Sequence, residues 1–388
     1  MPSKPLFDPR SSDFLEDPYS AYAVLRERDP VHWFAPLRAW MVTRYADCRF
    51  VLRDSGLFAA DPSRVRPDEP APPGVQGMDP PRSQAFRGAI GQALRGVESA
   101  EAETALTDRA AELLAARGGE PFDAIEDFIR PLVLRAVHLA LGVPEPDPAT
   151  FAPHLVALER LMDAGLRPEA VADTAPSREY VGRLVADWCA APAEGSPLQS
   201  FARWCGEAGV SEADFQSTVR FMALSTSGSV AAAVGNALLA LLRGPDGPAV
   251  LAPLDRAGLD RAADELLRYD GPVQAVTRIA AADLTLGGRQ VARGQEVIAL
   301  VAAANRDPEA FERPDEIVLD RAPNPHLALG RGAHVCLGAA LTRLVFRAAF
   351  TALLAVRPKL MLAGEPERVP VATLRSLRRL PVADGPRA

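Results

Sequence analysis

Residues 211–242 constrain the fold more than any other part of this sequence, because they follow the spacing of one long helix. At about 1.5 Å per residue, such a helix extends about 45 Å and crosses a whole domain, so we expect it to run through the core. Its middle, Ser225-Thr226-Ser227-Gly228-Ser229, is small and polar inside an apolar frame. That composition lowers helix propensity and favours a local distortion. A tight helix crossing and a contact with a cofactor would both account for it.

Helices are predicted over most of the first two thirds of the chain, with short strands early and late. The helical patterns cover residues 18–28, 83–141, 153–190, 198–242, 259–269 and 337–354. The β-rich runs are residues 31–34, 39–43, 273–279, 284–286, 290–291 and 296–300. Residues 62–81 are too rich in proline for a helix or a strand and predict a long loop that could cover a site. Without an internal repeat or clear linker, the order indicates one mainly helical α+β domain, residues 1–388, with small β-sheets.

Composition and charge narrow the function classes. The net charge of -7 argues against a nucleic-acid partner, which would favour a basic face. Residues 1–10 lack the apolar core of a signal peptide, and the longest apolar stretch, residues 230–242, is shorter than the roughly 20 residues of a spanning helix. We therefore expect a cytoplasmic protein without a membrane anchor. The four cysteines and five histidines are scattered, which predicts neither a disulfide framework nor a zinc site.

Cys336 lies in the glycine-rich segment Leu329-Gly330-Arg331-Gly332-Ala333-His334-Val335-Cys336-Leu337-Gly338, directly before a predicted helix. Glycines let the backbone curl closely under a flat ligand, and the amide hydrogens at a helix start favour an anionic sulfur. A thiolate in that place is a ready metal ligand. On these residues alone, a structural cysteine beside a glycine turn accounts for the segment equally well.

The pattern Gly330-x-Gly332-x-His334-x-Cys336-x-Gly338 resembles the cysteine-ligand loop of the cytochrome P450 haem-thiolate enzymes, and His326-Leu327-Ala328 before it also fits. Glu265-Leu266-Leu267-Arg268 is similar to the ExxR helix of that family, and Arg321 falls where the third partner of the pair is expected. Asn305-Arg306-Asp307-Pro308 matches a further bacterial segment. The resemblance extends from Asp17 to Val382 and implies the cytochrome P450 fold with haem b, its iron bound by Cys336.

The resemblance also implies roles for other residues. Glu265 and Arg268, three residues apart, share a helix face, and with Arg321 they would brace the haem-binding side as a structural network. The two haem carboxylates need basic or hydrogen-bonding partners, for which the family positions are Arg87, Arg278 and His334. The remaining residues expected around the cofactor are Leu329, Gly330 and Gly338.

This chain departs from the family pattern at three places. A histidine usually precedes the arginine at position 87 by four residues, and here that position is Ser83, which weakens one carboxylate contact. Leu329 replaces the usual aromatic residue beside the sulfur, which could shift the electron donation of the sulfur.

The third departure lies on the central helix, where the family usually carries Ala-Gly, one further residue, an acid and then threonine. Alignment through Gly235-Asn236 puts Ser225 and Thr226 at the first pair, Gly228 at the acid and Ser229 at the alcohol. Activation of dioxygen needs protons, so Ser229, Ser227, Thr226, water or the substrate would have to deliver them. No Asp or Glu occurs between Phe215 and Leu242, so a shifted alignment does not restore the acid.

Three functions follow from this resemblance. The first is a monooxygenase that tailors a small secondary metabolite by hydroxylation or another oxygen insertion. Because the acid is missing, the alternative is an oxidase that couples, crosslinks or desaturates an aromatic substrate without inserting oxygen. A third is an auxiliary protein that binds haem or ligand without turnover.

The resemblance to soluble bacterial members also implies partners. Electrons would come from a ferredoxin or a flavodoxin with its reductase, docking at a basic patch for which Arg331, Arg343 and Arg347 are candidates. The substrate would be shaped by residues 62–81, 155–176 and 273–276 and by the turn near Ser376-Leu377.

Overall fold

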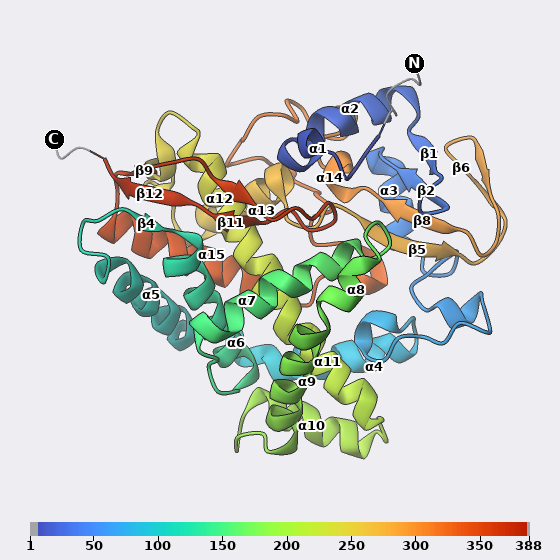
Figure 1. The fold of residues 1–388 in the computed structure, drawn as a ribbon, viewed down its shortest axis with the longest axis horizontal. Helices are drawn as coiled ribbons and strands as arrows, with labels where there is room; N and C mark the ends of the chain where they lie inside the picture. The colour runs from blue at the N-terminus through green and yellow to red at the C-terminus, as the bar shows by residue number, and fades with distance from the viewer. Residues whose placement is uncertain (1–6, 386–388) are drawn as a thin grey trace.

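The computed structural model describes residues 7–385, and most of them lie in helices (Figure 1). Of the segment at residues 1–10, in which no signal peptide is expected, the first six lie outside the described residues. The helices are α1 Ser12–Glu16, α2 Pro18–Arg28, α3 Tyr45–Arg53, α4 Arg82–Ala93, α5 Ala100–Ala115, α6 Arg130–Leu141, α7 Pro148–Glu159, α8 Glu169–Asp173, α9 Ala175–Ala190, α10 Pro197–Glu207, α11 Glu212–Ser225, α12 Ala231–Leu242, α13 Arg256–Asp270, α14 Val301–Ala304 and α15 Ala339–Val356.

The strands form a mixed sheet and three smaller ones. They are β1 Val31–Phe34, β2 Ala39–Val42, β3 Phe58–Ala59, β4 Phe122–Asp123, β5 Val276–Ala280, β6 Leu284–Leu286, β7 Arg289–Val291, β8 Glu296–Ala299, β9 Leu360–Leu362, β10 Glu367–Arg368, β11 Leu377–Arg379 and β12 Pro381–Asp384. The largest sheet has the order β1-β2-β8-β5-β3, in which β2 and β8 are parallel and the other neighbours antiparallel. It thus joins the early and late strands, as the sequence predicts, and lies at one end of the molecule in Figure 1.

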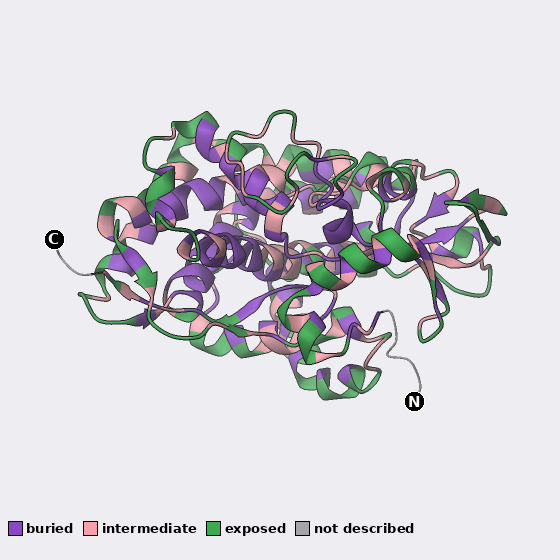
Figure 2. Ribbon diagram, turned by 90° about the horizontal axis from the view of Figure 1, so that it is seen from above, coloured by how far each residue is buried: buried purple, intermediate pink, exposed green. Residues whose placement is uncertain are grey.

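The long central helix is present as α11 and α12 with one widened turn, the π-helical segment η6 (Thr226–Val230), between them. The Ser211 side chain caps its start by accepting the amide of Asp214 at 3.1 Å. Helix α12 is buried along almost its whole length and packs with α6, α13 and α15 in the largest hydrophobic cluster. The buried helices in the middle of Figure 2 show this core. The predicted distortion is therefore confirmed, and it falls on the small polar residues.

Two helices of the described chain, Glu212–Leu242 and Ala339–Val356, are long and apolar enough to span a bilayer. Their apolar windows are 67% and 61% buried inside the protein. Core helices of globular proteins have this composition because they are covered on all sides by other elements. Their apolar surface is therefore accounted for by packing within the fold.

Residues 62–81 form the predicted irregular loop, interrupted by two short 3₁₀ turns, Pro62–Arg64 and Val75–Gly77. Hydrogen bonds fasten the loop to the central helix, two of them from backbone amides of the loop. Asp214 accepts the Gly74 amide at 3.0 Å, and Thr218 accepts the Val75 amide at 3.1 Å. The loop therefore lies across the first half of that helix.

Candidate active site at Cys336 and the central helix

The loop that carries Cys336 is a tight turn that only glycines can make. Gly330 and Gly332 have φ angles of 70° and 71°, in the left-handed region that L side chains rarely adopt. A Cβ at position 332 would lie 2.9 Å from Arg53 Cα, so Gly332 also lets the loop pack on α3. The Cys336 amide closes the turn by donating to the Leu329 carbonyl at 2.8 Å. The loop thus presents Cys336 in one fixed orientation before α15.

The sulfur of Cys336 lies in a recess. Its thiol is free and accessible. A Cβ at position 338 would lie 3.8 Å from the sulfur. Burial raises the pKa of the Cys336 thiol, whereas the Gly338 amide and the charges of Arg87 and Arg343 act the other way. An accessible sulfur with donors and cations around it suits a metal ligand, because metal binding requires the thiolate.

Glu265, Arg268 and Arg321 meet in a buried network. Arg268 donates to the two carboxylate oxygens of Glu265 at 2.8 and 2.9 Å, and both side chains are fully buried. The Arg321 Nε donates to the same oxygens at 3.1 and 3.0 Å, and Asn324 adds a donor at 3.2 Å. The rest of the Arg268 guanidinium binds the carbonyls of Asn305, Pro314 and Glu316. This network joins α13 to the segment before the Cys336 loop.

Two of the three residues assigned to haem carboxylates lack a carboxylate partner, whereas the third, His334, is hydrogen-bonded to Asp79 at 3.2 Å. Arg278 on β5 is buried, and its guanidinium donates only to the Thr277 carbonyl at 2.8 Å. Arg87 on α4 donates to the carbonyl of Val335, next to Cys336. Among residues 7–385, no carboxylate lies within ion-pair distance of either arginine. A buried cation needs an anion, so the buried Arg278, together with the partly exposed Arg87, fits a cofactor that carries carboxylates.

Asp79 lies beside His334 of the Cys336 loop, a contact that was not predicted from the sequence. It accepts hydrogen bonds from Arg64 at 2.7 Å, from His334 at 3.2 Å and from two backbone amides. Burial opposes its ionisation, but these hydrogen bonds outweigh burial and hold the pKa of Asp79 well below its usual range. The nearby Ser83 hydroxyl, which replaces the family histidine, is fully buried and has no hydrogen-bond partner. The donors around Asp79 thus stabilise one carboxylate, and the Ser83 hydroxyl beside it is without a partner.

The central-helix residues lie together in the widened turn. Ser229 donates its hydroxyl hydrogen to the Ser225 carbonyl at 2.6 Å, so this donor is already engaged. Ser227 is buried, and its hydroxyl has no hydrogen-bond partner. Gly228 is buried, whereas Thr226 is half-buried. The turn therefore offers hydroxyl groups but no acid of its own.

A carboxyl group from another helix approaches this turn. Glu159, the last residue of α7, places its Oε1 4.0 Å from the position a Cβ would take at Gly228. Its other oxygen accepts the Ser376 hydroxyl at 2.7 Å. Leu374 also lies 4.0 Å from the Gly228 position. Nothing in the sequence pattern around Glu159 predicts this position, because the contact spans 69 to 217 residues of chain.

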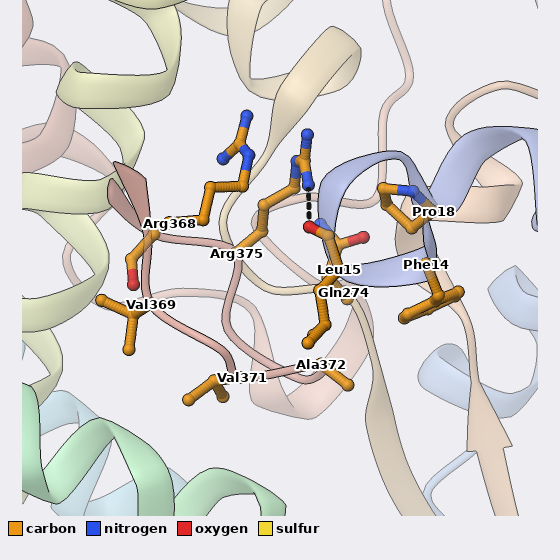
Figure 3. Close-up of a pocket in the computed structure, with 10 residues that line it drawn as sticks. Phe14, Leu15, Pro18, Gln274, Arg368, Val369, Val371, Ala372 and Arg375 are labelled. Carbon is orange, nitrogen blue, oxygen red and sulfur yellow. Dashed lines mark hydrogen bonds between the residues drawn. The ribbon is translucent and has the colours of Figure 1, made fainter. Parts of the chain in front are cut away.

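A second polar feature lies where the segment of Arg368 and Arg375 faces α1 (Figure 3). Arg368 and Arg375 line a small pocket there with Phe14 and Gln274. Its 10 Å³ hold roughly one water molecule. Arg375 binds Asp270 at 2.8 Å and the carbonyls of Leu15 and Glu16. The pocket is too small for an organic substrate, so it belongs to the framework.

The expected basic patch is only partly present. Arg331 is exposed, but Arg343 forms an ion pair with Asp264 at 2.8 Å. Arg347 is buried, and two acidic side chains neutralise it. The prediction is wrong for Arg347, because its apolar helix face packs into the core. A surface hollow on α3, lined by Arg49, Phe50 and Arg53, lies instead beside the Cys336 loop.

A mainly helical fold that presents an accessible cysteine from a glycine turn, beside two unpaired arginines, defines the class of haem-thiolate proteins. The cytochrome P450 family model matches residues 257–356. The chain is 32% identical to vitamin D(3) 25-hydroxylase of Pseudonocardia autotrophica, over 97% of this chain and 96% of that protein. It is also 32% identical to nocardicin C N-oxygenase of Nocardia uniformis subsp. tsuyamanensis, over 98% of each.

The crystal structure of CalO2 superposes with a TM-score of 0.83 at 30% identity, covering 98% of this chain and 99% of that one. The chain therefore belongs to the cytochrome P450 family. It is an oxidoreductase of that family, and the family implies a haem iron as cofactor. The residues present fit that group, because Cys336 would supply a sulfur ligand and the two arginines without carboxylate partners would supply counter-charges.

Proposed function

We propose that this chain, a single domain over residues 1–388, is a cytoplasmic monooxygenase that holds haem b through Cys336 and inserts oxygen into a small secondary metabolite. The observation that carries the proposal is the accessible Cys336 sulfur in a glycine turn, with two arginines that lack carboxylate partners beside it. Both named relatives, a 25-hydroxylase and an N-oxygenase, take their names from oxygen insertion.

Each part of the site has a separate task. Arg87, Arg278 and His334 would bind the haem carboxylates, and the glycines of the loop leave room for the flat ring. The network of Glu265 and Arg268 would hold the cysteine side rigid. Bound haem supplies the activation of dioxygen, while the protein orients the substrate and delivers protons.

The substrate would lie over the widened turn of the central helix. Val156, Val273 and Leu374 pack in one hydrophobic cluster, and Leu374 approaches Gly228. These residues come from three of the segments that the sequence analysis assigned to substrate contact. An apolar wall of this kind favours a largely apolar small molecule, oriented by few polar groups.

A second function, oxidative coupling or desaturation of an aromatic substrate, is favoured by one observation. The central helix carries no acid at Gly228, the place where the family usually has one. Coupling and desaturation remove two hydrogens and add no oxygen atom to the product. Both functions use the same cofactor and the same electron supply, so product analysis must separate them.

The test is turnover of candidate metabolites under ¹⁸O-labelled dioxygen, followed by mass spectrometry. Monooxygenation places one labelled oxygen in the product, whereas coupling or desaturation gives an unlabelled product lighter by two hydrogens. A Cys336→Ala protein serves as the matched control and should give neither product. Labelled hydroxylated product supports the proposal, and an unlabelled product alone supports the second function.

Electrons would come from a ferredoxin or flavodoxin with its reductase. The hollow at Arg49, Phe50 and Arg53 lies beside the Cys336 loop, and Arg331 is exposed on that loop. Cations beside an exposed aromatic ring suit an acidic electron-transfer protein, because charge complementarity steers its approach. The site is on the cysteine side, where the path to the iron would be shortest.

A further inference from the structure

Glu159 is a buried carboxyl group beside the widened turn of the central helix. It is 8% exposed, and its Oε1 lies 4.0 Å from the position of a Cβ at Gly228. Its Oε2 accepts the Ser376 hydroxyl at 2.7 Å. A buried carboxyl group is costly to keep unless it has partners or a function. This one lies next to the position on the central helix where this chain lacks an acid.

The nearby carboxylate of Asp163 has a purely structural role, with which Glu159 can be compared. Asp163, four residues later, accepts the backbone amides of Ala372 and Thr373 at 2.6 and 2.9 Å and thereby fastens the same turn. With Asp163 in place, the turn is already held at two amides. Glu159 adds one bond to a side chain, and its second oxygen faces Gly228 instead of a further turn amide.

The surroundings of Glu159 favour its protonated form. Burial raises the pKa of Glu159, although the hydrogen bond from Ser376 and the charge of Arg130 oppose this, while Glu126 reinforces it. Arg130 is buried, and its Nε lies 3.3 Å from a Glu126 carboxylate oxygen, an ion pair without hydrogen-bond geometry. The Glu126 side chain is 43% exposed. A row of charged groups thus leads from the surface towards Glu159.

We propose that Glu159 supplies the proton-donating carboxyl group that the central helix lacks, held by Ser376 and given room by Gly228. This inference rests on the proposed function, because it concerns the side of the site that faces the substrate. Glu159 is a positioning and relay residue, since its contacts are with Ser376 and the Gly228 turn. The acid of the usual pair would then come from α7 instead of the central helix.

The proton balance is closed by solvent. In each turnover the Glu159 carboxyl group gives its proton to a water or hydroxyl group at the Gly228 turn, and solvent water returns a proton to the Glu159 carboxylate. The carboxyl group therefore ends the cycle unchanged. Ser229 does not start this relay, because its hydrogen is donated to the Ser225 carbonyl.

The first test measures protonation without turnover. Infrared difference spectra of the haem-loaded protein, recorded as pH is raised, should show a protonated carboxyl band that persists at neutral pH in the wild type. Glu159→Gln should remove that band, because an amide has no carboxyl proton. The amide oxygen can still accept the hydrogen bond from the Ser376 hydroxyl. Asp163→Asn is the matched control and should keep the band. A band that survives in Glu159→Gln would overturn the inference.

The second test measures proton delivery and rescue. Glu159→Gln should lower the turnover number roughly 10²-fold, which is the lower end of the range for positioned acid groups. The spectral dissociation constant of the substrate should stay unchanged. Gly228→Asp in the Glu159→Gln background should restore most of the rate, because it returns an acid to the same place. Unchanged turnover in Glu159→Gln, or a double variant no faster than the single one, would overturn the inference.

The two failures are distinguishable. A wild-type protein whose reduced carbon monoxide complex lacks the red-shifted band of thiolate ligation would contradict the proposed function. If the wild type shows the thiolate band but Glu159→Gln changes neither the infrared carboxyl band nor the turnover rate, only the role of Glu159 is contradicted. Ser376→Ala provides a second variant: it should shift the carboxyl band without removing it.

Discussion

The cysteine side and the substrate side of this molecule are built in opposite ways. On the cysteine side, Glu265, Arg268 and Arg321 satisfy one another almost completely, and the loop of Cys336 is fixed by glycines with positive φ. On the substrate side, the central helix widens at small residues and leaves the Ser227 hydroxyl buried without a partner.

The difference reflects what each side must recognise. The cysteine side would bind a cofactor of constant shape, so we expect its geometry to depend on a few residues that must keep their identity. On the substrate side, the polar groups come from several elements that meet only in the folded chain, as Glu159 and Ser376 do. Predictions for the cysteine side should therefore give large, all-or-none effects, and those for the substrate side graded ones.

The largest effect is expected at Cys336. Cys336→Ala should abolish the red-shifted band of the reduced carbon monoxide complex and most of the bound haem, because it removes the only sulfur in the glycine turn. Absorbance spectra and haem content per protein measure both. Cys189→Ala is the control, since that thiol is free and lies on α9. A band retained in Cys336→Ala would show that another residue binds the iron.

The second-largest effect is expected at Glu265, and Asp264, its neighbour on α13, provides the comparison. Glu265→Ala leaves two buried guanidinium groups without their counter-charge and should cost about 3–5 kcal/mol of unfolding free energy, together with haem incorporation. Asp264→Ala removes a partly exposed pair with Arg343 and a longer contact with the buried His326, and it should cost less than Glu265→Ala because neither guanidinium of the buried network loses its counter-charge. Urea unfolding of both variants measures the difference. Equal costs would show that the buried network has no special role.

Sequence predicted the local structure of this chain far better than the contacts between distant segments. The helix at Pro18–Arg28, the strands at Val31–Phe34 and Leu284–Leu286 and the distortion of the central helix were all foreseen, because local periodicity and turn chemistry determine them. The contacts of Glu159 and Asp79 were not, because they join segments far apart in the chain. Arg347 was placed on the surface because sequence shows a charge but not which helix face packs.

A smaller effect is expected at the hollow on α3. Arg53→Glu should slow reduction by an acidic ferredoxin roughly 10-fold at low salt, because electrostatic steering raises association rates by about 10- to 10³-fold. The difference from wild type should shrink as salt rises. Arg183→Glu, an exposed arginine on α9, is the control and should leave the rate unchanged. Stopped-flow reduction measures these rates, and equal slowing by both variants would place docking elsewhere.

The smallest effect is expected at Ser229, at the centre of the substrate side. Its hydroxyl hydrogen is donated to the Ser225 carbonyl, so it cannot start a relay without breaking that bond. Ser229→Ala should therefore lose less than about 10-fold in turnover, well below the roughly 10²- to 10⁴-fold range of a positioned acid–base group. Thr107→Ala on α5 is the control, because it removes the same kind of helix bond, from the Thr107 hydroxyl to the Glu103 carbonyl at 2.8 Å, outside this site. Product formed per minute at saturating substrate and reductase decides the matter. A loss within the larger range would mean that Ser229 delivers the proton by itself and that the substrate side, like the cysteine side, depends on one residue.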